Sequence, residues 1–186
     1  KVCKRNPLRI SKNRGHSNRG YVSKFRLMKS ILHIADFYAN EIRGGGELVD
    51  QIVIDSLVER GYKVDRIKSK QVTEKLIKDN ADKTFIVSNF VMLNPACLRL
   101  LQTCDYVIYE HDHKYIVGRD PSLYKDYKVP ADQLTNLEFY RNAKAVFAQS
   151  KLHAEVISKN IREANVINLG CSLWSDEELD VLQKYV

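Results

Sequence analysis

Short apolar runs alternate with amphipathic segments along most of this chain, and this alternation constrains the fold more than any other feature. Several of the predicted strands are apolar throughout, as expected where both faces of a sheet are covered. We predict strands at residues 31–35, 62–67, 84–88, 105–109, 145–148 and 166–169, and helices at 47–60, 72–78, 94–103, 132–142, 152–161 and from 175 onward. The sequence therefore predicts an α/β fold with a Rossmann-like, doubly wound, mainly parallel sheet of about six strands and helices on both faces.

The charge of the chain is unevenly distributed. Residues 1–30 hold ten of the 30 Lys and Arg residues and no Asp or Glu, whereas the rest has 20 basic and 23 acidic residues. The formal net charge of +7 therefore comes from the first segment. We expect residues 1–28 to form an irregular basic arm with a short helix near 23–28, and residues 29–186 to form one domain. The arm is either a solvated tail or, as the only candidate in the chain, a segment that contacts nucleic acid or an anionic membrane.

Cysteine spacing and hydropathy bear on the compartment of the protein. None of the four cysteines is spaced as Cys-x-x-Cys, so the sequence predicts neither a zinc ribbon nor a disulfide scaffold. No apolar run approaches the roughly 20 residues that cross a bilayer. We expect a reducing, cytoplasmic location.

A glycine-rich segment, Gly44-Gly45-Gly46-Glu47, opens the first predicted helix. Glycine permits a ligand to approach the backbone closely, and the free N–H groups at the start of a helix favour a phosphate. The segment is not a dinucleotide fingerprint, because the third glycine would fall at Val49. It is not a Walker A loop either, because no Gly-Lys-Ser/Thr follows. A phosphate-binding loop and a simple connection from strand to helix both remain open.

An ionisable cluster, Glu110-His111-Asp112-His113, ends the predicted strand at 105–109. In an extended chain Glu110 and Asp112 share one side, and the two histidines share the other. Ligands bind at the carboxyl edge of such sheets, so His111 is a candidate general base, and Asp112 could act likewise or orient the His111 ring. His-x-His could also bind a metal ion, but no third ligand is evident, so we predict no metal site. A solvated, hydrogen-bonded turn is the remaining alternative.

Three further features complete the expectations. The length of the Tyr-rich segment at 114–130 predicts either a binding loop or lid, or plain surface. His33 lies inside the first strand and is expected to pack in the core. Trp174 is expected to anchor the last helix, which a capping box at Ser175-Asp-Glu-Glu178 opens.

Together, several motifs resemble the N-terminal domain of retaining glycosyltransferases of the GT-B fold, with closest likeness to glycosyltransferase family 4. The resemblance covers about residues 29–175. It is carried by Gly-Gly-Gly-Glu at 44–47, Glu-His-Asp at 110–112, Ala-Val-Phe-Ala-Gln-Ser at 145–150 followed by a helix, and Val-Ile-Asn-Leu-Gly at 166–170.

This resemblance implies transfer of a sugar, with retention, from a UDP- or GDP-sugar to an unknown acceptor, without a required cofactor or metal. Gly44, Gly45, Gly46 and Glu47 would form the donor phosphate site, with Gly45 and Gly46 nearest the diphosphate. His111 or Asp112 would line the catalytic cleft. Candidates for the acceptor are Glu110, Lys114, Arg119 and Ser150.

The resemblance also implies that this domain does not act alone. In that family a second domain holds most of the donor and carries two glutamates seven residues apart. We therefore expect the chain to be weakly active or inactive unless a C-terminal donor domain or a partner chain completes the cleft.

Two other classes of function remain open. The chain could be a Rossmann-like nucleotide- or NAD-binding module, which a thermal-shift response to NAD but not to UDP- or GDP-sugars would favour. It could instead be a non-catalytic binding protein that uses the basic arm. Steeply salt-dependent binding that is lost on deletion of residues 1–28 would support that reading.

Overall fold

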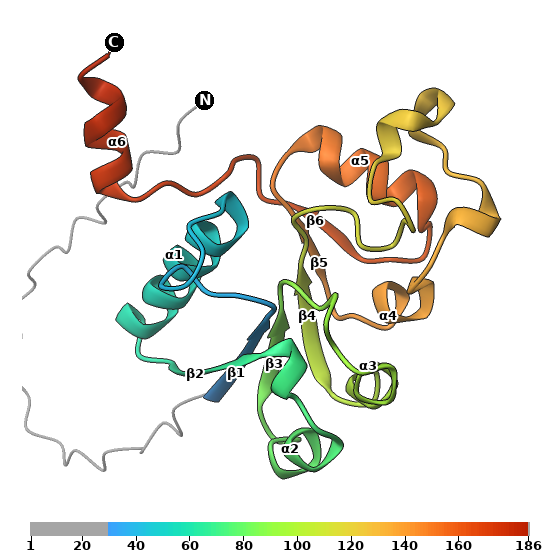
Figure 1. Ribbon diagram of the computed structural model, residues 1–186, viewed down its shortest axis with the longest axis horizontal. Coiled ribbons are helices and arrows are strands. Elements are labelled where there is room, and N and C mark those ends of the chain that lie inside the picture. Colours follow the sequence, from blue (N-terminus) through green and yellow to red (C-terminus); the bar gives the residue numbers. More distant parts are fainter. Residues whose placement is uncertain (1–29, 186) are drawn as a thin grey trace, which may run out of the picture.

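A computed structural model describes residues 30–185, and in it a single six-stranded sheet forms the centre of the molecule (Figure 1). The predicted basic arm and its short helix lie outside the described residues. The strands are β1 (Ser30–Ala35), β2 (Lys63–Lys68), β3 (Thr84–Val87), β4 (Asp105–Tyr109), β5 (Val146–Ala148) and β6 (Val166–Asn168). The α-helices are α1 (Gly45–Glu59), α2 (Glu74–Asp79), α3 (Pro95–Leu101), α4 (Leu137–Arg141), α5 (Lys151–Asn160) and α6 (Asp176–Gln183).

All neighbouring strands pair in parallel, in the order β2-β1-β3-β4-β5-β6. The chain first moves outward from β1 to β2, then returns across β1 to β3 and continues in the opposite direction. The strand order therefore reverses between β1 and β3, and such a reversal creates a crevice at the carboxyl ends of the strands. The predicted Rossmann-like α/β fold is confirmed.

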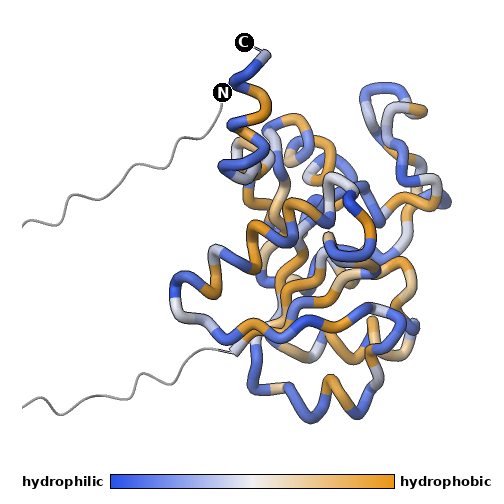
Figure 2. The backbone as a smooth tube through the Cα atoms, turned by 60° about the vertical axis from the view of Figure 1, so that its left-hand side comes forward, coloured by the Kyte–Doolittle hydropathy of each residue, from blue (hydrophilic) through white to orange (hydrophobic). Residues whose placement is uncertain are grey.

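Side-chain alternation along the strands divides the core into two faces. Leu32, Ile34, Phe85 and other residues of the larger face pack against α2, α3, α4 and α5. The opposite face, which includes Ile31 and Ile86, packs against α1 and against Leu169 and Leu173 after β6. Figure 2 shows hydrophobic residues along the strands, with hydrophilic residues more frequent in the surrounding segments.

Local sequence signals account for several helix boundaries. The side chain of Asn94 accepts a hydrogen bond from the Ala96 N–H, and Pro95 occupies the first turn of α3. Gly61 adopts a φ of +82° directly after α1, a conformation that glycine tolerates best. Ser175 and Glu178 form the predicted capping box of α6.

The prediction of a single helix at 132–142 is wrong. The chain forms a short 3-10 turn at Ala131–Gln133 and then the separate helix α4. Asn136 separates them, because it has a left-handed φ of +53°. Its Nδ2 donates to the carbonyl oxygen of Lys114, 2.9 Å away, and the Thr135 N–H donates to the Tyr115 carbonyl. These contacts hold the connection against the loop after β4.

The segment after β6 also differs from expectation. Trp174 is 52% exposed, so it does not act as the predicted packing anchor. Helix α6 buries none of its residues, and Figure 1 shows it apart from the sheet at the end of an extended segment. Among residues 30–185, no helix combines the length and apolar character needed to span a membrane.

Replacement of Leu101 by Ala tests the packing of the larger core face. Leu101 is fully buried on α3, whereas Leu182 on α6 is 46% exposed. We expect Leu101→Ala to lower the free energy of unfolding by about 2–5 kcal/mol, because it removes buried apolar contacts and leaves a cavity. Leu182→Ala is the control and should change it by less than about 0.5 kcal/mol. Urea unfolding of both variants measures the difference, and equal effects would contradict the described packing.

Candidate functional site

The glycine-rich segment and the Glu-His-Asp-His segment meet at the carboxyl edge of the sheet. Gly44 caps α1, and Gly45 and Gly46 are its first residues, so the N–H groups of Gly45 and Gly46 have no partner within the helix. A side chain placed on Gly46 would lie 3.4 Å from the ring of His111. The helix start and the His111 ring are therefore in close proximity, although about 65 residues separate them in sequence.

The His111 ring is held on both sides. Its Nε2 lies 3.0 Å from Oδ1 of Asp50, and its Nδ1 lies 2.7 Å from Nε2 of Gln149. Ser172 donates to Oε1 of Gln149 at 2.8 Å, which leaves the amide N–H of Gln149 to donate to Nδ1. Both ring nitrogens are thus engaged, so His111 can accept a proton only after Gln149 moves away. The predicted orienting role of Asp112 is wrong, because Asp50 is the carboxylate on the ring.

Asp50 belongs to a buried polar network between α1 and β1. Its side chain is 1% exposed, and its Oδ2 accepts no hydrogen bond from the described residues. His33, predicted as a core residue, is indeed fully buried, but its Nε2 lies 3.1 Å from the Ser88 hydroxyl and 3.8 Å from Asp50. Burial, the largest effect, lowers the pKa of His33. His33 is therefore a neutral partner at neutral pH.

A second polar cluster lies around Glu110. The Glu110 carboxylate accepts hydrogen bonds from the Lys114 ammonium at 2.9 Å, from the Tyr140 hydroxyl and from the Asp112 backbone N–H. Lys114 also pairs with Asp112, which in turn pairs with Arg119 at 2.8 Å. Glu110 and Lys114 are almost fully buried. Glu110 and Asp112 both contact Lys114, although β4 ends at Tyr109 and the chain bends at 111–112 instead of continuing the extended alternation expected there.

This cluster keeps its charges. Burial alone would raise the pKa of Glu110, but the Lys114 ammonium and the hydrogen bonds outweigh it and lower the pKa to about 2. Burial would lower the pKa of Lys114, but Glu110 and Asp112 raise it. The pair is consequently ionised over the ordinary pH range, and its charges balance internally.

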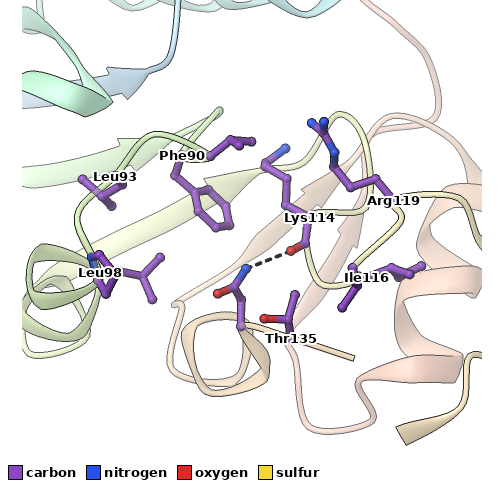
Figure 3. A pocket seen from close by; sticks show the side chains of 11 residues that line it. Phe90, Leu93, Leu98, Lys114, Ile116, Arg119 and Thr135 are labelled. Carbon is purple, nitrogen blue, oxygen red and sulfur yellow. Dashed lines mark hydrogen bonds between the residues drawn. The ribbon is translucent and has the colours of Figure 1, made fainter. Parts of the chain in front are cut away.

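Next to this cluster is a pocket of about 330 Å³ (Figure 3). Phe90, Leu93 and Leu98 line one side, and Lys114, Ile116 and Arg119 line the other. The lining is mainly apolar, with Thr135 and Asn136 as polar groups besides the two cations. Two of the four residues predicted for the acceptor, Lys114 and Arg119, therefore lie at one pocket.

The other predicted residues have different surroundings. Ser150 is exposed and caps α5, where its hydroxyl accepts from the His153 N–H. The Glu47 carboxylate lies back against Gly44, and its negative charge suits a hydroxyl group better than a phosphate. The N–H groups of Gly45 and Gly46 are thus the phosphate-binding candidates within this segment.

His113 departs from the predicted alternation. It has a φ of +57°, so the chain is not extended there, and the His113 side chain does not lie on the same side as that of His111. Its ring packs against His153 of α5, with centroids 4.6 Å apart. Burial lowers the pKa of His153 to about 4. Among residues 30–185, no three His, Cys, Asp or Glu side chains lie close enough together to hold a metal ion.

Three residues of the site were missed by sequence reasoning. A signal existed for Asp50, because it occupies an inward position of α1 together with Val49, Val53 and Ile54. Gln149 lies in the segment 145–150 that resembles the family, but the resemblance implies no role for it. Tyr140 gave no signal, because its contact with Glu110 depends on how α4 packs.

Comparison with known proteins adds no family assignment. A scan against protein-family models and a search of curated proteins find no match to this chain. Membership of a glycosyltransferase family therefore remains a prediction.

Replacement of Lys114 by Met tests the buried ion pair. We expect Lys114→Met to lower the free energy of unfolding at pH 7 by about 3–5 kcal/mol, because the Glu110 charge remains buried without its cation. The double variant Glu110→Gln/Lys114→Met is the control and should recover much of this loss.

The pH dependence of the same variants follows from the direction of the pKa shift. Because the pKa of Glu110 is lowered from 4.5 to about 2, the pair stabilises the wild type above pH 4.5 and this contribution is lost as the pH falls toward 2. The deficit of Lys114→Met should therefore shrink in acid, as urea unfolding at several pH values will show. A deficit that is independent of pH would contradict this account.

Proposed function

We propose that this chain is the acceptor-side domain of a glycosyltransferase that transfers a sugar, with retention, from a UDP- or GDP-sugar to an acceptor. The approach of Gly46 to the His111 ring, at the carboxyl edge of a parallel sheet, is the observation that carries the proposal. It brings a candidate diphosphate site next to a polar side chain that can meet the transferred sugar.

The start of α1 supports a role in binding the donor diphosphate. Its first N–H groups have no side-chain cap, and the dipole of this 15-residue helix favours a negative charge at its start. Gly45 is exposed, and nothing lies within 4 Å of the position where its side chain would be. A phosphate can therefore approach the backbone without displacing a side chain. During transfer, these groups would stabilise the charge of the leaving diphosphate.

The pocket beside Lys114 supports an acceptor site on the same edge. It is formed by the segments that follow β3 and β4, and Arg119 and Thr135 in its lining offer hydrogen-bond donors. In this proposal the acceptor binds in or next to the pocket, whereas a second domain or a partner chain holds most of the donor.

A Rossmann-like NAD-binding module is the main rival. The strand order and the helix start suit it equally well. However, Val49 occupies the place of the third glycine of the fingerprint, and it is buried between α1 and the sheet. The third glycine of the fingerprint allows the helix to pack closely on the strand, and Val49 does not. This difference favours a nucleotide-sugar over NAD as the ligand.

Replacement of Gly45 by Val tests the proposed diphosphate site. We expect the chain to bind UDP, GDP or one of their sugars, with amide chemical-shift changes at residues 44–47 in NMR titrations. Gly45→Val should weaken this binding by about tenfold or more, because the new side chain blocks approach to the helix start.

Gly118→Val is the matched control for this experiment. Gly118 also has open space around its would-be side chain, but it lies in the loop after β4. It should leave diphosphate binding unchanged, and both variants should unfold at similar urea concentrations. Binding of NAD with no response to UDP, GDP or their sugars would overturn the proposed function in favour of its rival, as would unimpaired binding by Gly45→Val.

A further inference from the structure

The environment of Asp50 suggests more than a packing role. It is a carboxylate on the inner face of α1, 1% exposed, and within the described residues its ion-pair contacts are with two imidazoles, at 3.0 Å to His111 and 3.8 Å to His33. No lysine or arginine of that part of the chain lies within ion-pair distance of it. A buried carboxylate strongly favours a neighbour that donates a hydrogen bond to it.

His111 is the neighbour best placed to donate. His33 is too far from Asp50 for a hydrogen bond, and its Nε2 faces the Ser88 hydroxyl instead. A neutral imidazole carries one N–H, and the partner of one nitrogen decides which nitrogen bears the proton. With the carboxylate at Nε2, the proton of neutral His111 belongs on Nε2, and Nδ1 is left with a lone pair.

Gln149 matches this arrangement on the opposite side of the ring. Its Oε1 accepts from the Ser172 hydroxyl, and its amide N–H faces Nδ1 at 2.7 Å. An amide N–H at this position makes the same kind of contact that a hydroxyl group of a bound ligand would make. Tyr109 packs beside the ring, with centroids 5.1 Å apart, and a side chain added at Gly46 would lie 3.4 Å from the ring. The ring is thereby fixed in place.

We propose that Asp50 is a positioning residue for the transferase site. It holds His111 as the Nε2–H tautomer, so that the Nδ1 lone pair is available to a substrate hydroxyl when Gln149 releases it. This inference rests on the proposed function for the identity of the hydroxyl, which would belong to the sugar or the acceptor. The tautomer itself depends only on the contacts described.

The test is a measurement of the tautomer of His111 in the full chain labelled with ¹⁵N. Long-range ¹H–¹⁵N spectra, recorded about two pH units above the ordinary histidine pKa of about 6.5, distinguish Nε2–H from Nδ1–H. In the wild type His111 should be almost entirely Nε2–H. In the double variant Asp50→Asn/Gln149→Leu, where no amide N–H opposes a proton on Nδ1, the ratio of the tautomers should shift by about tenfold or more toward Nδ1–H, because the new amide N–H can donate to Nε2.

Two further variants separate Asp50 from its surroundings. In Gln149→Leu the Nε2–H tautomer should persist, because Asp50 and not Gln149 selects it. Ser88→Ala is the control, and it should alter the resonances of His33 but not the tautomer of His111. An unchanged tautomer in the folded double variant, or a switch to Nδ1–H in Gln149→Leu alone, would overturn the proposal. If the double variant does not fold, the result for Gln149→Leu decides.

This readout is independent of the transferase proposal, because it requires no sugar nucleotide. If the chain binds neither UDP nor GDP nor their sugars, the proposed function fails while the tautomer result stands. If a nucleotide-sugar binds, its addition should shift the Nδ1 resonance of His111 and the side-chain amide of Gln149. Binding that leaves both resonances unchanged would overturn the role of Nδ1 as the hydroxyl acceptor.

Discussion

Parallel pairing of β1 with both β2 and β3 is the constraint on which the site depends. The connection after β1 leads to one side of the sheet, and the connection after β3 leads to the other. Helix α1, which follows β1, therefore starts beside the crevice between these two connections. Parallel strands also bring all their carboxyl ends to one edge. The start of α1, the end of β4 and the turn after β5 therefore meet there, so that Gly46, His111 and Gln149 become neighbours.

Alternation at the end of β4 then divides the polar residues between two faces. His111 turns toward α1 and joins Asp50, whereas Glu110 turns toward α4 and joins Tyr140 and Lys114. Each cluster buries charged groups, which is costly unless hydrogen bonds and opposite charges compensate. The Glu110 cluster is compensated internally. The Asp50 cluster depends on imidazoles, and one of them, His111, lies next to the candidate donor site.

Sequence patterns predicted the sheet and most helices, because hydrophobic periodicity reports local burial directly. They also predicted that the glycine-rich segment and His111 meet, because the carboxyl ends of parallel strands share one edge. They failed where a tertiary contact decides the outcome. Asn136 breaks the helix expected at 132–142 by bonding to the Lys114 carbonyl, and Asp50 replaces Asp112 as the partner of His111. Neither contact can be recognised from a local sequence pattern. The position of Asp50 on the inner face of α1 indicated only that this carboxylate would be buried.

The central claim is that a nucleotide-sugar lies across the start of α1 with its sugar toward His111. A crystal structure of the chain with a bound UDP- or GDP-sugar tests it most directly. The account predicts diphosphate oxygens within hydrogen-bond distance of the N–H groups of Gly45 or Gly46, and a sugar hydroxyl near Nδ1 of His111 in place of the Gln149 amide. A nucleotide bound elsewhere on the sheet, with the His111–Gln149 contact intact, would contradict it.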